Sequence, residues 1–442
     1  MRAWVLVLLL LAAACDGDDD APAAPPDERA EEPAEARAAQ GDPAETAPEP
    51  APLPPPPNIP VAPPSEGPVI AIDTHVDTTQ RMLDEGDDPF EPLEGGHLDV
   101  PRMREGGLTG AFFSIYVSPR RVEAGEPSWE RALALIARVR EVAEAHPDEA
   151  VLATSAEDVR RAAREGKIAM LMGVEGAHAL GTDDPERALE RIRELHRRGA
   201  RYMTITWSVD NPLGHSSTGE HPDRGLTPLG RRAVRLMNEL GMIVDVSHVS
   251  DRTFWDIMEV AERPVLASHS SARALADHPR NMRDRMIHAV AAGGGAVCVN
   301  YYTQYIDADY RGRRRAIEFR RRREFEALDE DHESWVDRGR AAFALARRLD
   351  PELDPPDLGT LADHFEHIVR IGGPSAACLG SDFDGVPELP VGMEDVSDLG
   401  ALRAALEARD LPIRPIFGGN VLRVLAAAGP GDADADRGAP EE

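Results

Sequence analysis

Short apolar runs alternate with helical patterns along the chain from Pro68 onward. Eight of these runs have the length and composition of buried strands. Between them, apolar residues recur at helical spacing, as in residues 130–145 and 229–240. Strands that alternate with helices are typical of an α/β fold with a parallel sheet, and eight such units predict a closed (β/α)8 barrel of the TIM type. The predicted strands are residues 69–73, 109–116, 168–173, 201–206, 242–247, 264–268, 295–300 and 376–381.

The segments outside the barrel pattern differ from it in composition. Residues 16–67 are rich in Pro, Ala and acidic residues and have almost no aromatic residues, which predicts a disordered, acidic, Pro-rich linker. The barrel domain is expected over residues 68–428, with a helical insertion around 303–357 that is rich in Arg and Glu. A solvated helical surface is the simpler interpretation of this insertion, and an anion-binding surface is the alternative. Residues 429–442 are expected to form a disordered tail.

Residues 1–15 have the pattern of a lipoprotein signal peptide. Arg2 gives a positive start, residues 4–11 form an apolar core too short to span a bilayer, and small residues precede Cys15. This order resembles a bacterial lipobox with Cys15 as the lipidated residue, although Ala12 stands where such motifs usually have Leu. We therefore expect an extracytoplasmic protein, lipid-anchored to a bacterial membrane in the periplasm or at the cell surface. A secreted soluble form and a cytosolic protein are the alternatives.

Charge and cysteine content narrow the classes of function. The formal net charge of -30 argues against nucleic-acid binding, because phosphate contacts require clustered Lys and Arg. Besides Cys15, the chain has Cys298 and Cys378, both inside apolar runs. We expect two buried, unreactive thiols, with a disulfide between them as the alternative in an oxidising compartment.

Residues that can bind a metal follow several of the predicted strands. His75 and Asp77 follow the first strand and share one face of an extended segment. Glu175 follows the third strand between two glycines, and His248 and His269 follow the fifth and sixth strands, one β/α repeat apart. Because the active site of a barrel lies at the carboxyl ends of its strands, these side chains are expected to converge. Nitrogen and oxygen ligands without sulfur suit zinc, with manganese or cobalt as alternatives.

Two carboxylates follow the eighth predicted strand beside a turn. Asp382 is nearer to the strand end and is expected to act as the catalytic acid and base, with Asp384 as the alternative. For each of these residues alone, a structural role is the simpler interpretation. The prediction of a metal centre therefore depends on the complete set.

Six segments, in order from residue 70 to about residue 425, resemble the signatures of the membrane dipeptidase (renal dipeptidase) family. They are DTHVD, HLDVPRMREGG, GVEGAHAL, GLTPLGRRAVRLMNELGMIVDVSHVS, PVLASHSSARALADHPRN and GSDFDGVPELPVGMEDVSDL. The resemblance implies a binuclear zinc barrel of the amidohydrolase type that hydrolyses dipeptides. It also implies a homodimer, since members of the family are often dimers.

Matching the motifs residue by residue assigns the metal ligands. The resemblance implies two zinc ions per chain, with Glu175 bridging them. His75 and Asp77 would bind one ion, and His248 and His269 would bind the other. A hydroxide between the metals would attack the scissile carbonyl, since zinc lowers the pKa of bound water and polarises the carbonyl group.

The same matching assigns the residues that would handle the substrate. Asp382 would take the proton from the attacking hydroxide and deliver it to the leaving amine. Arg280 would bind the terminal carboxylate of the substrate. Trp207 stands where mammalian members have a His that helps to stabilise the tetrahedral intermediate. An indole N–H donates a hydrogen bond but carries no positive charge, so this stabilisation is expected to be weaker or to come from His215.

A zinc-dependent dipeptidase is the function that the ligand set and the resemblance favour, acting on short peptides such as those from cell-wall turnover. Trp207 keeps a second hypothesis open, a related amidohydrolase that acts on another amide or ester, such as a β-lactam or an N-acyl amino acid. A third hypothesis is a catalytically inactive surface lipoprotein that uses the barrel for binding. The intact ligand set argues against it. The expected partners are a dipeptide substrate and a membrane that holds the lipid anchor.

Overall fold

The computed structural model describes residues 53–59, 69–331 and 335–429. The predicted signal peptide with Cys15, most of the predicted linker and the predicted tail from residue 430 onward lie outside the described residues. Within the described part of the chain, no helix combines the length and the apolar character needed to cross a bilayer.

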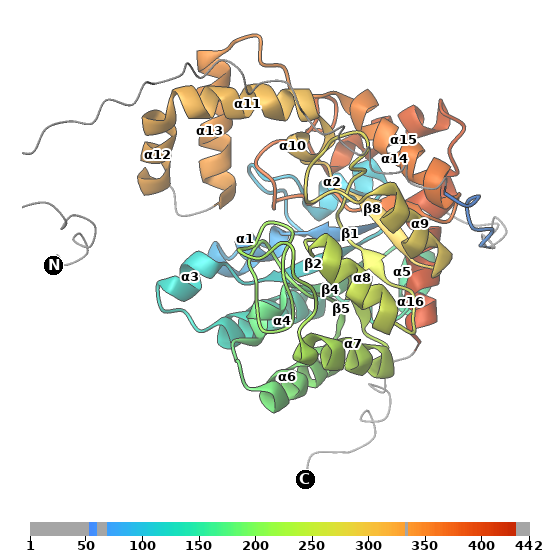
Figure 1. Cartoon of the computed structure of the whole chain (residues 1–442). Helices are drawn as coiled ribbons and strands as arrows, with labels where there is room; N and C mark the ends of the chain where they lie inside the picture. Colours follow the sequence, from blue (N-terminus) through green and yellow to red (C-terminus); the bar gives the residue numbers. More distant parts are fainter. Residues whose placement is uncertain (1–52, 60–68, 332–334, 430–442) are drawn as a thin grey trace, which may run out of the picture. The chain divides into compact units, whose positions relative to one another are not determined.

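Eight parallel strands close into a barrel (Figure 1). The ring runs β1, β2, β4, β5, β6, β7, β8 and β9, and β9 pairs again with β1. Each of these strands overlaps one predicted strand, which confirms the predicted fold. The bounds are β1 (Ile72–Val76), β2 (Gly110–Tyr116), β4 (Ile168–Glu175), β5 (Ala200–Thr204), β6 (Ile243–Asp245), β7 (Leu266–Ala267), β8 (Ala296–Val299) and β9 (Ala377–Leu379).

Some details of the strands differ from the prediction, among them β4, which continues to Glu175 and so contains this residue. A ninth strand, β3 (Ala150–Leu152), pairs with the first residues of β4, and its three residues are too short a run to stand out in the sequence. The first strand ends at Val76 rather than at Asp73, because pairing continues past the apolar run, with Val76 opposite Phe113 of β2. His75 therefore lies inside β1 and not after it.

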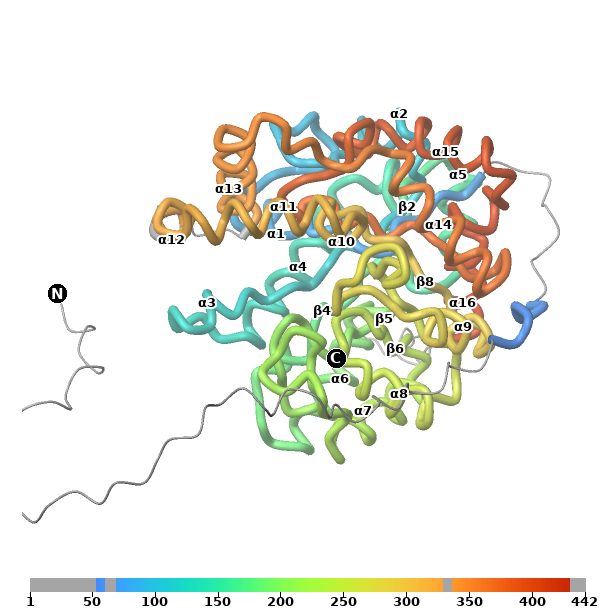
Figure 2. The backbone as a smooth tube through the Cα atoms, turned by 45° about the horizontal axis from the view of Figure 1, so that its top comes forward, coloured from blue at the N-terminus to red at the C-terminus, as the bar shows by residue number. Residues whose placement is uncertain are grey.

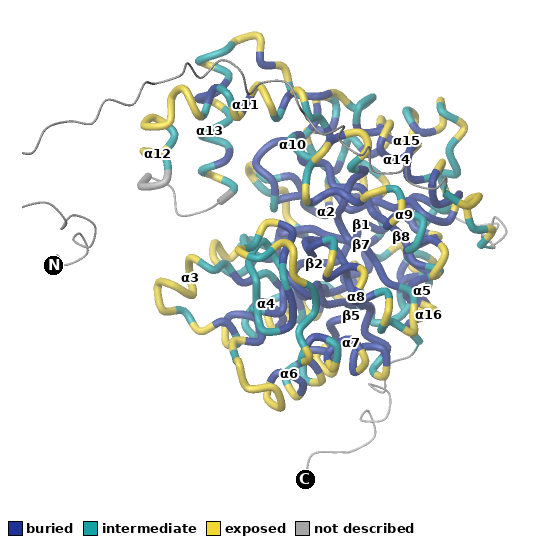
Figure 3. Tube along the Cα trace, viewed as in Figure 1, coloured by how far each residue is buried: buried dark blue, intermediate teal, exposed yellow. Residues whose placement is uncertain are grey.

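Helices cover the outside of the barrel, whose strands form the buried centre of the molecule (Figure 3). The cap residues of α7 show how the sequence sets such a helix: Thr227 accepts a hydrogen bond from the Gly230 N–H at its start, and Gly241, with a φ of 75°, ends it. The α-helices are α1 (Thr78–Asp84), α2 (Val100–Gly106), α3 (Pro119–Glu123), α4 (Ser128–Ala145), α5 (Ala156–Glu165), α6 (Pro185–Arg197), α7 (Pro228–Leu240), α8 (Asp251–Val260), α9 (Asp284–Ala292), α10 (Thr303–Ile306), α11 (Ala308–Arg320), α12 (Arg322–Asp331), α13 (Trp335–Leu349), α14 (Leu358–Gly372), α15 (Leu399–Glu407) and α16 (Asn420–Ala428). Shorter helical turns are η1 (Ala177–Leu180), η2 (Val396–Asp398) and η3 (Pro415–Gly419).

Helices α10 to α13 fall in the range of the predicted helical insertion, between β8 and α14. Figures 1 and 2 both show α11, α12 and α13 at one side of the barrel. A small apolar cluster of its own stabilises this insertion, formed by Tyr310, Ile317, Ala346 and Leu353. The short helix α10 joins the insertion to the carboxyl end of β8.

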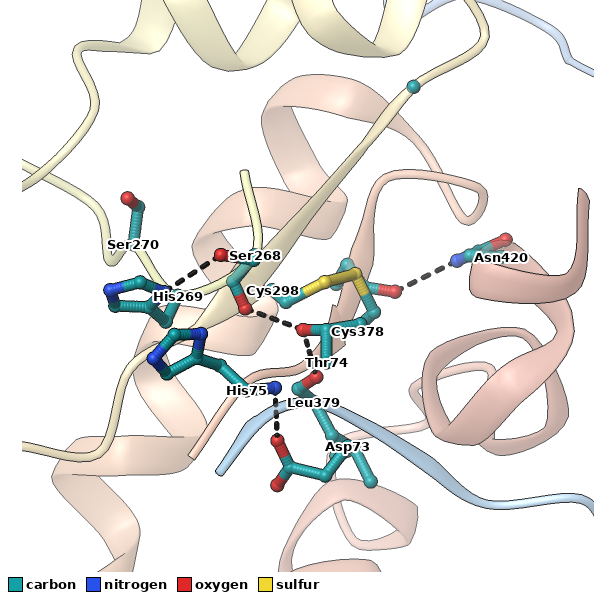
Figure 4. Close-up of a disulfide and its surroundings, with 12 residues drawn as sticks. Asp73, Thr74, His75, Ser268, His269, Ser270, Cys298, Cys378, Leu379 and Asn420 are labelled. Carbon is teal, nitrogen blue, oxygen red and sulfur yellow. Dashed lines mark hydrogen bonds between the residues drawn. A yellow bond between two sulfur atoms is a disulfide. The ribbon is translucent and has the colours of Figure 1, made fainter. Parts of the chain in front are cut away.

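Cys298 of β8 and Cys378 of β9 are joined by a disulfide (Figure 4). The two residues lie opposite each other in the parallel pairing of the two strands, and both are completely buried. The expectation of two free thiols is therefore wrong, and the alternative holds. The sequence could not decide this point, because it does not give the register of two strands that are 80 residues apart.

Part of the predicted linker contacts the barrel. Leu53 packs against the hydrophobic core. The Pro55 carbonyl accepts a hydrogen bond from Nε2 of His288, at 3.3 Å. The prediction of a disordered linker through residue 67 did not anticipate these contacts.

Candidate active site

All five predicted metal ligands lie at the carboxyl ends of barrel strands. His75 is in β1 and Asp77 directly follows it, while Glu175 is the last residue of β4. His248 follows β6 and His269 follows β7. All five side chains are buried. The structure thus brings together residues that are up to 194 positions apart in the sequence.

Glu175 is at the centre of this cluster. Its Oε2 lies 3.5 Å from Nε2 of His75, and Asp77 Oδ2 lies 3.5 Å from the same nitrogen. Its Oε1 lies 3.0 Å from Nε2 of His248 and 3.6 Å from Nε2 of His269. One oxygen of this carboxylate therefore lies near His75, and the other lies near His248 and His269.

Hydrogen bonds behind the imidazoles determine which nitrogen faces the centre. The Tyr202 hydroxyl donates to the Thr74 carbonyl at 3.0 Å, so it accepts a hydrogen bond from His75 Nδ1 at 2.8 Å. This assigns the ring proton of neutral His75 to Nδ1 and leaves Nε2 with a lone pair, as a metal ligand requires.

The same arrangement occurs at His269. Ser268 Oγ donates to Asp245 Oδ2 at 2.6 Å and accepts a hydrogen bond from His269 Nδ1 at 2.8 Å. Figure 4 shows this Ser268–His269 contact, with the His75 ring beside the His269 ring. Asp245 is itself fixed by the backbone N–H groups of Ser247 and Ser268. A buried carboxylate thus orients this second imidazole through a serine hydroxyl.

The charges in the cluster are unevenly distributed. Burial raises the pKa of Glu175, but the three histidines outweigh it and hold the pKa well below its usual range. Burial lowers the pKa of His248 to about 3 and that of His269 well below its usual range. Burial also lowers the pKa of His75, but Tyr202 and Glu175 outweigh it and raise the pKa well above its usual range. The cluster therefore combines an ionised carboxylate with two neutral imidazoles and stabilises positive charge near His75.

Unpaired polar atoms test whether a cation fits. His75 Nε2 and Asp77 Oδ1 are buried and have no hydrogen-bond partner among the described residues. The Nε2 atoms of His248 and His269 are only 2.8 Å apart. Since buried polar atoms are normally paired, the unpaired His75 Nε2 and Asp77 Oδ1 indicate that the cluster is suited to bind cations. Carboxylate oxygens and imidazole nitrogens without sulfur fit zinc.

Asp382 has the surroundings of a catalytic acid and base. Its Oδ2 accepts a hydrogen bond from Asn300 Nδ2 at 2.9 Å. It also offers an oxygen within 4.8 Å of ligand atoms of His75 and Asp77. Burial raises the pKa of Asp382 to about 7, with His75 opposing the rise and with Asp77 and Glu175 adding to it. A pKa near neutrality allows this carboxyl group both to accept and to donate a proton.

Asp384, the alternative acid and base, is part of a structural network. Its Oδ2 accepts from the Thr78 hydroxyl at 2.6 Å, and its Oδ1 accepts from the His97 N–H at 2.6 Å. Its own N–H donates to His97 Nδ1 at 3.0 Å. Both oxygens are therefore used to join α1, the segment before α2 and the segment after β9.

The backbone near the cluster has unusual conformations. His248, Asp382 and Asp384 have φ values of 67°, 66° and 63°, which are rare for residues other than glycine and occur often at functional sites. Gly385 is required for a different reason. A Cβ atom there would overlap the carboxylates of Asp77 and Asp382. The turn after β9 therefore brings these two carboxylates close together.

Arg280 is positioned to bind an anion. The residue is only 3% exposed. Its Nη2 donates a hydrogen bond to the His269 carbonyl at 3.1 Å. Its Nε and Nη1 are buried and have no hydrogen-bond partner among the described residues. Buried, unpaired N–H donors on a cationic guanidinium are suited to bind an anion such as a carboxylate.

Trp207 lies beside the cluster, after β5. Its ring centroid is 6.2 Å from that of His248 and 5.1 Å from that of Tyr116. His215, the other candidate for stabilising the intermediate, donates through Nδ1 to the Gly225 carbonyl at 2.8 Å. Of these two residues, Trp207 is the one with a ring contact to a predicted metal ligand.

The sequence interpretation missed the residues that hold the ligands in place. These residues are Tyr202, Asp245, Ser268 and Asn300, which contact the metal ligands or Asp382 directly or through one hydroxyl. A further missed residue is His178, which donates through Nε2 to the Val117 carbonyl and has a buried, unpaired Nδ1. The first four lie inside predicted strands, where a buried polar residue was the available signal.

A closed β/α barrel with buried histidines and carboxylates at the carboxyl ends of its strands defines the class of the protein. It is a barrel enzyme with a metal-binding centre. Comparison with known proteins then gives the family: the model of the membrane dipeptidases, peptidase family M19, matches residues 67–434. The chain belongs to this family and is a metallo-dipeptidase.

Individual relatives agree with this assignment. A protein of Schizosaccharomyces pombe described as an uncharacterized dipeptidase is 31% identical over 375 residues, which cover 80% of this chain and 79% of the relative. The solved metallo peptidase from Rhodobacter sphaeroides, liganded with a phosphinate mimic of the dipeptide L-Ala-D-Ala, is 26% identical with a TM-score of 0.65, covering 81% of this chain and 99% of that one. The probable dipeptidase PvdM from Pseudomonas aeruginosa shares the fold, with a TM-score of 0.68 at 24% identity, covering 81% of this chain and 95% of that one.

Proposed function

We propose that the protein is a zinc-dependent dipeptidase whose centre holds two zinc ions bridged by Glu175. The observation that carries this proposal is the position of the two Glu175 oxygens, one near His75 and the other near His248 and His269. Asp77 completes the first pair of ligands, with His75. The dipeptide mimic in the Rhodobacter sphaeroides relative supports a dipeptide as the substrate.

Each side chain has a task in peptide hydrolysis. Bound zinc supplies an activated water at neutral pH and polarises the scissile carbonyl. Asp382, with a pKa of about 7, accepts the proton of the attacking water and gives it to the leaving amine. Asn300 holds the Asp382 carboxyl group in place by its hydrogen bond.

Two residues beside the cluster would orient the dipeptide. The unpaired Nε and Nη1 of Arg280 would bind the terminal carboxylate of the substrate. Trp207 lies on the His248 side of the cluster and offers an indole N–H, a neutral donor, to the oxyanion that forms during attack.

Metal removal and reconstitution test the proposal. The full chain would be stripped with a chelator, dialysed and assayed with L-Ala-D-Ala before and after addition of Zn²⁺, with metal content measured by elemental analysis. We expect loss of hydrolysis on stripping and recovery at about two zinc ions per chain. Hydrolysis by the completely stripped protein would contradict the proposal.

The position of Trp207 supports a second candidate function, the hydrolysis of another amide or ester. The reason is that a neutral indole lies beside His248. Kinetics with an N-acyl amino acid and a β-lactam, compared with a dipeptide, distinguish the two candidates. A higher kcat/KM for substrates that lack a free terminal carboxylate would favour the second candidate over the first.

We also propose that Cys15 anchors the protein to a bacterial membrane outside the cytoplasm. The order of charged, apolar and small residues before Cys15 supports this proposal. Expression of the full chain and of Cys15→Ala in bacteria supplied with labelled palmitate tests it. We expect label and membrane association for the native chain only, whereas a soluble and unlabelled native chain would contradict it.

A further inference from the structure

The helical insertion reaches the candidate carboxylate-binding residue through α10. Tyr305 of α10 lies against Arg280, whose guanidinium carbon is 5.6 Å from the Tyr305 ring centroid. The rings of His278 and Tyr302 lie 4.5 Å and 4.9 Å from the Tyr305 ring. Tyr305 thus belongs to a group of three aromatic rings beside the guanidinium, one of them from the turn that carries Arg280.

Hydrogen bonds from side chains to backbone carbonyls join the turn around Arg280 to the same insertion. Asn281 Nδ2 donates to the Tyr305 carbonyl at 2.6 Å. Arg311 of α11 donates to the Asp277 carbonyl at 2.6 Å. These bonds fix the backbone on both sides of Arg280 but leave most of its long side chain without a hydrogen-bond partner.

The side chain of Arg280 needs a further contact to keep its orientation. Only Nη2 has a hydrogen-bond acceptor among the described residues, the His269 carbonyl. A single bond allows the guanidinium plane to turn about it. The face of the Tyr305 ring restricts that rotation, and a cation next to an aromatic face gains about 0.5 to 2 kcal/mol.

The charges of the cluster affect the Tyr305 hydroxyl. Burial raises the pKa of its hydroxyl, Arg280 opposes the rise, and the charges of Asp382 and Glu175 add to it. The Tyr305 hydroxyl therefore stays neutral, and its ring contacts the Arg280 guanidinium.

We propose that Tyr305 is a positioning residue, which holds the Arg280 guanidinium in the orientation that receives the terminal carboxylate of the substrate. This inference rests on the proposed dipeptidase function. It assigns a role in substrate recognition to the insertion, in addition to the barrel. In this proposal the contact of the guanidinium with the ring carries the effect, so phenylalanine is expected to replace tyrosine.

A double-mutant cycle tests whether Tyr305 acts through Arg280. The zinc-loaded full chain, Tyr305→Leu, Arg280→Gln and the double variant would be assayed with L-Ala-D-Ala. Loss of the ring contact is expected to raise KM by about 2- to 30-fold with little change in kcat, which is the fold-change equivalent of the cation–ring energy. In the Arg280→Gln variant, adding Tyr305→Leu should cause no further rise in KM.

Two controls separate this role from a structural one. Tyr305→Phe keeps the ring and is expected to restore the native KM, and the backbone bond from Asn281 is unaffected by either substitution. Phe319→Leu changes an aromatic residue of the same insertion that is 83% exposed, and it should leave KM unchanged.

The outcomes distinguish this inference from the proposed function. Equal effects of Tyr305→Leu in the native and Arg280→Gln backgrounds would overturn it, as would a Tyr305→Phe variant as impaired as Tyr305→Leu. A loss confined to kcat would also overturn it. If the zinc-loaded native chain hydrolyses no dipeptide, the proposed function itself fails.

Discussion

Removing one hydroxyl group behind His75 tests how the barrel prepares its metal ligands. Tyr202→Phe deletes the atom that accepts from His75 Nδ1 at 2.8 Å and donates to the Thr74 carbonyl at 3.0 Å. The aromatic ring stays, so its packing against Phe112, at a centroid distance of 5.0 Å, is retained. The substitution therefore isolates the hydrogen bonds from the shape of the core.

The expected magnitude follows from burial. His75 and Tyr202 are both completely buried, so no water replaces the lost hydroxyl. Leaving one buried donor unpaired costs about 1 to 3 kcal/mol of unfolding free energy. Loss of the group that orients a metal-binding imidazole typically weakens metal affinity by about 10- to 100-fold. Both effects should appear in the same variant.

The assay combines zinc competition with a fluorescent chelator and urea unfolding of the stripped protein. Tyr301→Phe is the matched control, because the Tyr301 hydroxyl is also buried but has no hydrogen-bond partner among the described residues. We expect native zinc affinity and no loss of stability for Tyr301→Phe. If Tyr202→Phe also binds zinc as the native chain does, the proposed role of the hydroxyl in orienting His75 is incorrect.

Three further substitutions test other parts of the site and fold. Asp382→Asn should lower kcat by about 10²- to 10⁴-fold at unchanged zinc content, and a variant with native kcat would exclude Asp382 as the acid and base. Gly385→Ala should lower kcat/KM by about 10²-fold, because the added Cβ displaces the Asp77 and Asp382 carboxylates, and native kinetics would refute this packing. Burial lowers the pKa of His364 to about 4 from 6.5, and its Nδ1 accepts the Ala272 N–H. Between pH 4 and pH 6.5 the unfolded chain therefore binds more protons than the folded chain. The free energy of unfolding falls as the pH is lowered through this range, and His364 contributes up to about 3 kcal/mol of that fall. His364→Gln should remove that share of the pH dependence in urea unfolding, and an unchanged slope would contradict it.

The order of polar and apolar residues was enough to predict the barrel, and it placed the five candidate ligands at strand ends, whereas their role as ligands stays a prediction. Eight apolar runs gave eight strands, and the barrel geometry then required that residues at their carboxyl ends meet. The structure places His75, Glu175 and His269 in one group with ligand atoms within 4.8 Å of one another. Residues that follow separate strands could be assigned to one site because the strands are parallel, so their carboxyl ends lie at the same end of the barrel.

Features that depend on exact register or on side-chain direction could not be predicted. From its place nearer to the strand end, the sequence favoured Asp382 as the acid and base, with Asp384 on the same strand as the alternative. The sequence could not show that Asp384 hydrogen-bonds to Thr78 and to the His97 backbone, which are far away in the sequence, and the role of Asp382 stays a prediction. The role of Tyr305 was hidden for a similar reason, because it lies in a segment whose charge pattern indicated only an exposed helical insertion.

An anomalous difference map from crystals of the zinc-loaded protein, measured at the zinc absorption edge, would locate the cations directly. We expect two peaks, each about 2 Å from one oxygen of Glu175, one beside His75 and Asp77 and the other beside His248 and His269. Peaks away from Glu175, or no peak among these five residues, would contradict the proposed metal centre.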